Sequence, residues 1–216
     1  MDSAAARLTE ACRALGVPLS PPAPAALARY ALLLLEWNAR VNLVSRQDTA
    51  RILDYHLVDS LAANALLPAG VRAADVGSGA GLPGIPLALV RPDVGMLLVE
   101  SSGRKATFLD HAVRELGLAN VEVCHGRSED LPALECGIIL SRLTGPMKRV
   151  VRWTRHHLAR GGTIVFYKTP GEQAGVDESL PTLRRCGLAV TGTRDVTLPL
   201  TGITRRFVLV GAAAAT

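Results

Sequence analysis

The chain has 216 residues, of which 49% are hydrophobic and 20% are charged. This length and composition predict a folded globular protein with one full core, and they exclude an intrinsically disordered chain. The formal net charge of +5 favours a polyanionic partner. The longest apolar run covers only residues 31–35, and residues 1–20 include acidic side chains and lack the apolar segment of a secretory leader. We therefore expect a cytoplasmic protein that does not enter a membrane.

Cysteine usage also bears on the compartment and on metal binding. The four cysteines, Cys12, Cys124, Cys136 and Cys186, are scattered, with no C-x-x-C pair and no nearby histidine at zinc spacing. We interpret them as reduced thiols and expect no metal site.

The first third of the chain has helical patterning. Leu27, Tyr30, Leu34 and Trp37 form one stripe, which is typical of core packing. The expected helices cover residues 3–15, 25–37 and 54–67. A proline-rich connector separates the first two, and a polar, basic stretch precedes the third. We interpret residues 1–67 as a short helical cap.

From residue 71 onward, apolar strand-like runs alternate with helical segments. The expected strands are residues 72–76, 95–99, 121–124, 137–140, 163–167, 188–193 and 205–210. The expected helices are residues 84–90, 103–116, 145–159 and 175–186. This rhythm predicts an α/β Rossmann-like domain over residues 68–211, with a mostly parallel sheet. Only a polar loop joins the last two strands, and it is too short for a crossover, so these strands should form an antiparallel hairpin.

A glycine-rich stretch follows the first expected strand and is typical of a nucleotide-binding loop. Gly79, Gly81 and Gly84 match the dinucleotide pattern G-x-G-x-x-G. Asp75 followed by Gly77, Gly79 and Gly81 matches the D-x-G-x-G-x-G loop of S-adenosylmethionine methyltransferases. The glycines alone do not choose between these cofactors. The antiparallel C-terminal hairpin favours S-adenosylmethionine, because NAD-binding domains normally lack it.

Polar residues at the expected strand ends can be assembled into one site. Glu100, which follows the second strand, can accept both ribose hydroxyls. An acid at Glu129 or Asp130 can accept from the adenine amino group, while Ser128 offers its backbone N–H to a ring nitrogen. Arg142 follows the fourth strand and can bind either the methionine carboxylate or the substrate. The sequence does not separate these two roles.

The residues absent after the fourth strand narrow the reaction. No Asn/Asp-Pro-Pro-aromatic run is present to hold an exocyclic amine, and no Pro-Cys pair is present to attack a pyrimidine ring. A substrate atom with a nucleophilic lone pair needs neither device. The N7 atom of guanine is such an atom, and its methylation depends on alignment and exclusion of water.

Basic residues gather in the polar stretch of the cap and after the fourth strand. Few aromatic residues are present, so phosphate contacts on structured RNA fit better than base stacking. A generally basic, solvated surface is the alternative. His56 lies three residues before Asp59 on an expected helix and is a candidate phosphate or base contact, with a structural hydrogen bond as the alternative. The candidate RNA-binding residues are Arg40, Asn42, Arg46, His56 and Arg149.

Several motifs resemble the ribosomal RNA small subunit methyltransferase G family, also called glucose-inhibited division protein B. The motifs lie at residues 35–43, 56–61, 75–86, 103–109 and 141–142. The resemblance implies S-adenosylmethionine-dependent methylation of guanine N7 in small-subunit (16S) ribosomal RNA. It also implies cofactor contacts at Gly77, Leu82, Ser128, Glu129 and Arg142.

The sequence departs from the family pattern on the substrate side of the pocket. Residues 143–146 replace a small residue after Ser-Arg, and Thr169 and Pro170 follow Lys168 where the family has Gly. We predict that Arg142 and Lys168 position the substrate, without a certain catalytic residue. A methyltransferase acting on a small heterocycle is the main alternative, followed by a non-catalytic RNA-binding module and an NAD-dependent oxidoreductase. We expect a monomer.

Overall fold

The protein is described by a computed structural model that covers residues 2–142 and 144–213. Leu143, one of the departures on the substrate side, lies outside the described residues. The chain forms a seven-stranded sheet with the strand order β3-β2-β1-β4-β5-β7-β6. The strands are β1 (Arg72–Val76), β2 (Gly95–Glu100), β3 (Val121–His125), β4 (Cys136–Ser141), β5 (Leu158–Lys168), β6 (Leu188–Thr197) and β7 (Thr204–Ala212).

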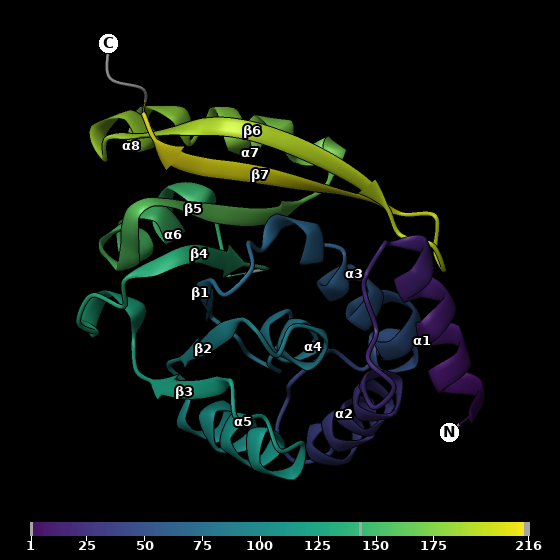
Figure 1. Ribbon diagram of the computed structural model, residues 1–216. Helices are drawn as coiled ribbons and strands as arrows, with labels where there is room; N and C mark the ends of the chain where they lie inside the picture. The colour runs from purple at the N-terminus through teal and green to yellow at the C-terminus, as the bar shows by residue number, and fades with distance from the viewer. Residues whose placement is uncertain (1, 143, 214–216) are drawn as a thin grey trace.

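The first five strands are parallel to one another, and β7 lies between β5 and β6 and is antiparallel to both. The predicted class, a mostly parallel Rossmann-like sheet ending in an antiparallel hairpin, is therefore confirmed (Figure 1). The strand order reverses between β1 and β4. In such sheets the crevice at the carboxyl ends of the strands, beside this reversal, is where ligands bind.

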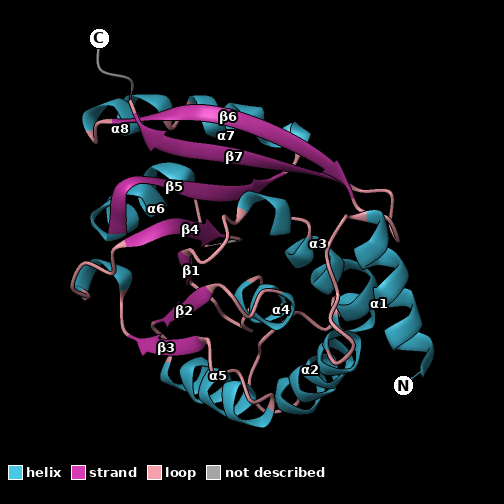
Figure 2. Cartoon of the chain, in the orientation of Figure 1, coloured by secondary structure: helices cyan, strands magenta, loops and turns pink. Residues whose placement is uncertain are grey.

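Helices cover both faces of the sheet, as Figure 2 shows. In the cap they are α1 (Asp2–Ala14), α2 (Ala23–Asn38) and α3 (Val58–Leu61). In the rest of the chain they are α4 (Gly84–Val90), α5 (Gly103–Glu115), α6 (Met147–Thr154), α7 (Gln173–Asp177) and α8 (Leu180–Arg185). The cap helices lie beside α4 and α5, whereas α6, α7 and α8 lie on the other face (Figure 1).

The cap shares one hydrophobic core with the sheet. Leu27, Tyr30 and Leu34 of α2 are buried in the same cluster as Phe108 and Leu109 of α5. Helix α4 lies between α2 and the sheet. It is apolar around almost its whole circumference because α2 covers one side of it and the sheet covers the other. The division into residues 1–67 and 68–211 thus remains an interpretation of a chain whose core is continuous.

Three predicted helices were wrong in extent. The helix expected at residues 145–159 ends in α6 at Thr154 and a 3-10 turn, because residues from Leu158 onward pair with β4. Gly161, with φ +78°, lies within β5, where the register of its pairing with β4 is irregular. The helix expected at residues 175–186 is divided into α7 and α8, with Pro181 in the first turn of α8.

The third correction concerns the cap. The helix expected at residues 54–67 is a composite of a 3-10 turn (Thr49–Arg51), a π-helical turn (Ile52–Leu57), α3 and a second 3-10 turn (Asn64–Leu66). The π turn carries His56 and ends two residues before Asp59. The side chains of His56 and Asp59 are both buried. Such turns often occur at functional sites.

Over the described part of the chain, no helix is both long and apolar enough to cross a membrane. Within the same residues, no group of three or more His, Cys, Asp or Glu side chains is arranged to hold a metal ion.

Candidate active site

The glycine-rich loop begins where β1 ends and runs into α4. Gly77, Gly79 and Gly81 have φ angles of +73°, +57° and +83°, a region that favours glycine. A Cβ atom at Gly77 would lie 2.6 Å from Cγ2 of Thr144, and one at Gly81 would lie 2.5 Å from the side chain of Ile85. Backbone conformation therefore favours glycine at all three positions, and close packing adds to this at Gly77 and Gly81.

Asp75, at the end of β1, is a buried carboxylate beneath the loop. Its Oδ2 accepts the N–H of Gly84 at 2.9 Å, and its Oδ1 has no hydrogen-bond partner among the described residues. Burial raises the pKa of Asp75 to about 7, partly opposed by the hydrogen bond from Gly84. The unpaired oxygen is thus an acceptor for a donor group that the described chain does not supply.

Glu100, at the end of β2, fixes the loop from the neighbouring strand. Its Oε2 accepts the N–H of Gly79 at 2.8 Å, and its Oε1 accepts the N–H of Ser102 at 2.7 Å. Each carboxylate oxygen has a second lone pair, so these contacts orient the group without exhausting its acceptors. The predicted contact with ribose hydroxyls is compatible with this orientation.

Two adjoining pockets open at the carboxyl edge of the sheet, and Gly77 lines both. The smaller one, of about 110 Å³, includes Ser128, Glu129 and Trp153. The larger one, of about 250 Å³, includes the loop residues 77–80, Leu82 and Arg142. Six of the nine predicted cofactor-binding residues thus line the two pockets, whereas Asp75, Gly81 and Glu100 lie behind or within the loop and do not line them.

Arg142 lies at the inner wall of the larger pocket and is held by the cap. Its Nη1 donates to Oδ2 of Asp59 at 2.9 Å, and its Nη2 donates to Nδ1 of His56 at 3.1 Å. Arginine cannot accept a hydrogen bond, so Nδ1 of His56 must be the acceptor and the neutral ring carries its proton on Nε2. Burial and the charge of Arg142 lower the pKa of His56.

A second arginine shares the same carboxylate. Arg205 of β7 donates to Oδ1 of Asp59 at 2.6 Å, to the carbonyl of Lys168 at 3.0 Å and to the hydroxyl of Tyr55 at 3.0 Å. Asp59 is 1% exposed, so its charge is balanced by two buried guanidinium groups rather than by water. His56 and Asp59 thus both contact Arg142. Through Asp59, hydrogen bonds connect the cap to the wall of the larger pocket and to the C-terminal hairpin.

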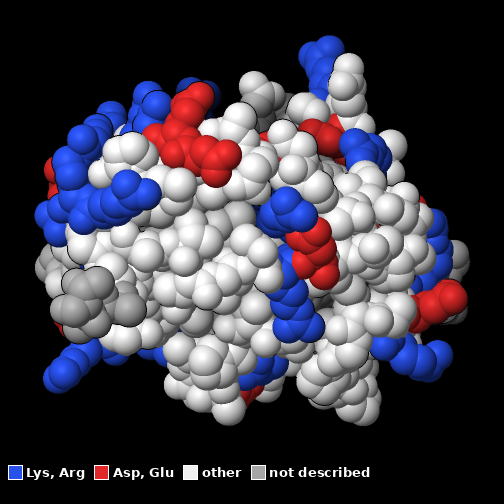
Figure 3. Space-filling model, turned by 90° about the horizontal axis from the view of Figure 1, so that it is seen from above, with Lys and Arg blue, Asp and Glu red and all other residues white. Residues whose placement is uncertain are grey.

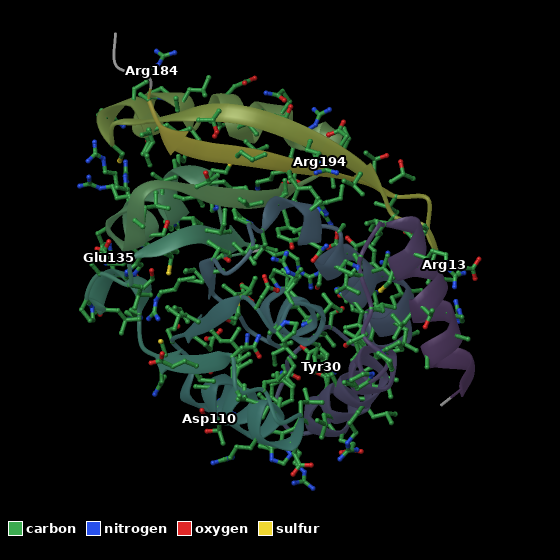
Figure 4. The ribbon with its side chains drawn as sticks, in the orientation of Figure 1. Arg13, Tyr30, Asp110, Glu135, Arg184 and Arg194 are labelled. Carbon is green, nitrogen blue, oxygen red and sulfur yellow. The ribbon has the colours of Figure 1, made fainter. Side chains whose placement is uncertain are left out.

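Tyr30 connects the cap to the glycine loop. The sequence pattern assigned it to the core stripe of α2, and it is fully buried, but its hydroxyl donates to the carbonyl of Ala80. Figure 4 shows Tyr30 inside the molecule, whereas Arg13 and Asp110 lie at its periphery. A buried tyrosine hydroxyl needs a partner, and here it supports the loop.

The candidate RNA-binding residues do not all share one environment. Asn42 and Arg46 line a third cavity, of about 520 Å³, which shares residues 43–45 with the larger pocket, and Arg40 lines a separate pocket with Glu36 and Trp37. Arg149 is exposed, with its guanidinium 5.7 Å from the ring centre of Trp153. His56, in contrast, is buried, and it forms part of the wall of the larger pocket.

Lys168 is not among the residues that line the two cofactor-side pockets. Its ammonium group pairs with Glu172 at 3.0 Å. Its predicted positioning role stays a prediction. Sequence reasoning missed Lys105 and Asp48, which both line the larger pocket. Lys105 lay within a motif of the family resemblance, and Asp48 had no signal beyond its place in the polar stretch.

The geometry fits S-adenosylmethionine. The unpaired Oδ1 of Asp75 and the second lone pairs of Glu100 suit a ligand that carries an ammonium group and hydroxyls, and glycines leave room for it. A Rossmann-like sheet with this loop and a β7 hairpin defines an S-adenosylmethionine-dependent methyltransferase. Among solved structures, a SAM-dependent methyltransferase from Aquifex aeolicus has the same fold, with a TM-score of 0.57 and 20% identity over 77% of this chain and 94% of that one.

Sequence comparison assigns the family. The family described as rRNA small subunit methyltransferase G (GidB) matches residues 24–189. The protein of that name from Laribacter hongkongensis is 46% identical over 68% of this chain and 72% of its own length. The one from Chromobacterium violaceum is 39% identical over 90% of this chain and 91% of its own. The chain belongs to the rRNA small subunit methyltransferase G family, and its methyl donor is S-adenosylmethionine.

Proposed function

We propose that this protein transfers a methyl group from S-adenosylmethionine to N7 of a guanine in small-subunit (16S) ribosomal RNA. Family membership supports the RNA substrate, because the matched relatives are named for it. A small heterocyclic substrate is the weaker alternative, because relatives that are 39% and 46% identical are named as ribosomal RNA methyltransferases.

The environment of His56 is the observation that carries the choice of acceptor atom. His56 is the histidine that lines the larger pocket, and its basic Nδ1 is already bound to Arg142. It is therefore not free to remove a proton from an attacking group. An acceptor such as guanine N7, which attacks with its own lone pair, needs no such base.

The residues of the two pockets have separate roles in this proposal. Ser128 and Glu129 hold the adenine, and Glu100 holds the ribose hydroxyls. Residues 77–81 and Asp75 face the methionine portion, with Leu82 against it, and Arg142 orients the reacting end. When bound, the cofactor supplies the electrophilic methyl group. The chain's own contribution is alignment of the base with it and exclusion of water.

The RNA-binding face is proposed to run along the polar stretch of the cap and past Arg149. Asn42 and Arg46 flank the larger pocket on one side, Arg40 lines a separate pocket of the cap, and Arg149 flanks the smaller pocket through Trp153. Figure 3 views a different face, from the side of β6 and β7, and Lys and Arg side chains are scattered over it among uncharged residues. Phosphate contacts at the mouth of the site would position the RNA.

We also infer that the protein acts as a cytoplasmic monomer. Residues of a single chain line both pockets, so the site needs no second copy. Sedimentation of the protein with and without RNA tests the monomer directly.

The test is transfer of labelled methyl to deproteinised small-subunit RNA, with the modified base identified by digestion. Wild-type protein should yield 7-methylguanine, and Arg142→Ala should abolish transfer. The matched control is Arg184→Ala, an arginine of α8 that lies at the periphery in Figure 4 and should leave transfer intact. Transfer to a small heterocycle but to neither RNA nor ribosomal particles would contradict the proposal.

A further inference from the structure

The larger pocket contains one acidic side chain that the proposed chemistry does not use. Its charged lining residues among those described are Asp48, Lys105 and Arg142, together with the neutral His56. The side chain of Asp48 is 31% exposed, so a ligand in the pocket can reach it. A carboxylate at the mouth of a site for a polyanion is unfavourable unless it recognises a donor group.

The Asp48 carboxylate is held in place from two sides. Its Oδ2 accepts the hydroxyl of Ser45 at 2.6 Å, and its Oδ1 lies 3.3 Å from Nε2 of His56. The contact of His56 with Arg142 keeps the proton on Nε2, so an N–H faces the carboxylate. That N–H is buried and makes no regular hydrogen bond within the described residues.

These supports also keep the group ionised. The hydrogen bond from Ser45 lowers the pKa of Asp48, burial raises it by less, and the neighbouring His56 and Arg51 lower it further. Each oxygen retains lone pairs beyond the contacts with Ser45 and His56. Asp48 is therefore a preoriented, bidentate acceptor at neutral pH.

Only one RNA base matches such an acceptor. Guanine presents two adjacent donors, N1–H and the N2 amino group, on its Watson–Crick edge. Adenine and cytosine place a donor beside an acceptor on that edge, and uracil places its single N–H between two carbonyls. Enzymes that modify a base taken out of its stack read this edge. The N7 atom lies on the opposite edge of guanine, so the contact leaves its lone pair free to react.

We propose that Asp48 selects guanine by accepting N1–H and N2–H from its Watson–Crick edge. This inference rests on the proposed function and adds the residue that distinguishes the substrate base. Ser45 and His56 position the Asp48 carboxylate and do not themselves touch the base.

The test pairs a protein change with the removal of one substrate atom group. The methylated guanine, once located in an RNA fragment, is replaced by inosine, which lacks the N2 amino group and keeps N7. We expect kcat/KM of the wild-type protein to fall by about 10- to 100-fold, the loss of a charge-assisted hydrogen bond. With Asp48→Ala the same replacement should cost less than about 2-fold, because the acceptor is gone. The amino group's own effect on N7 reactivity cancels between the two proteins.

Controls separate recognition from folding. Affinity for S-adenosylhomocysteine should be the same for wild-type protein and Asp48→Ala. Asp54→Asn is the matched control, since this nearby carboxylate pairs with Arg7 and does not line the pocket, and it should keep the wild-type penalty for inosine.

Each outcome has a distinct meaning. An equal inosine penalty in wild-type protein and Asp48→Ala overturns the role of Asp48 while leaving the guanine methyltransferase intact. If the variant does not fold, the wild-type comparison decides alone, and equal rates on guanine and inosine overturn the inference. If wild-type protein modifies neither RNA, the proposed function itself fails.

Discussion

Replacing Asp59 by Asn tests whether the buried carboxylate is the anchor of the site. Asp59 accepts hydrogen bonds from Arg142 at 2.9 Å and from Arg205 at 2.6 and 3.1 Å. An amide of the same shape keeps one acceptor and turns an NH₂ group toward a guanidinium. Two buried cations then lack their counter-charge, which typically costs about 3–5 kcal/mol. Most domains have a total stability of only about 5–15 kcal/mol, so the variant should fold but be markedly weakened.

Urea unfolding followed by circular dichroism measures this change. With a slope of about 2 kcal/mol per molar, the unfolding midpoint should fall by about 2 M. The matched control is Asp195→Asn, which removes a carboxylate from an exposed bidentate pair with Arg206 and should shift the midpoint far less. Methyl transfer by Asp59→Asn should also fall under conditions in which it is fully folded, because Arg142 loses its orientation. Equal midpoints for the two variants would refute the anchoring role.

Three further predictions follow from the loop and its supports. Gly77→Ala should abolish binding of S-adenosylhomocysteine in calorimetry, because its Cβ would meet Thr144 at 2.6 Å and its φ of +73° disfavours alanine; unchanged affinity would contradict the loop geometry. Tyr30→Phe removes the hydroxyl bonded to Ala80 and should destabilise the fold by about 1–3 kcal/mol in urea unfolding; no change would show that the bond contributes nothing. The pKa of Asp75 is raised to about 7, so the folded state retains a proton that the unfolded state loses near pH 4. The free energy of unfolding of wild-type protein should therefore fall, relative to Asp75→Asn, as pH rises from about 4 to 7, and a constant difference would show that the pKa is not raised.

The glycine loop and the acid that supports it were predictable because their signals are local. The strand at residues 72–76, the glycines that follow it and the acid at the end of the next strand all lie within thirty residues, and each has a fixed geometric requirement. The C-terminal hairpin was predictable because its connection is too short for a crossover.

The supports from the cap were not predictable in the same way. Asp59 and Arg205 are 146 residues apart in sequence, and nothing in either neighbourhood indicates their pairing. Tyr30 fits a core stripe equally well with or without a partner for its hydroxyl. The strand pairing of Leu158 was hidden because residues 145–159 continue a helical pattern, and only the pairing with β4 overrides it.

This difference indicates where substrate choice resides in the molecule. The smaller pocket is lined by residues of the sheet domain, from Val76 to Trp153, and a class I methyltransferase fold suffices to build it. The larger pocket is lined on one side by cap residues 43–48 and His56, and on the other by the glycine loop. In the proposed function the donor occupies the smaller pocket and lies against the glycine loop, both built by the sheet domain, and we expect the acceptor base where the cap faces that loop. Because the cap holds Arg142 through Asp59 and His56, a change in the cap that alters RNA recognition should also displace the residue at the reacting end. We therefore expect substrate recognition and alignment for methyl transfer to be coupled through the buried carboxylate of Asp59.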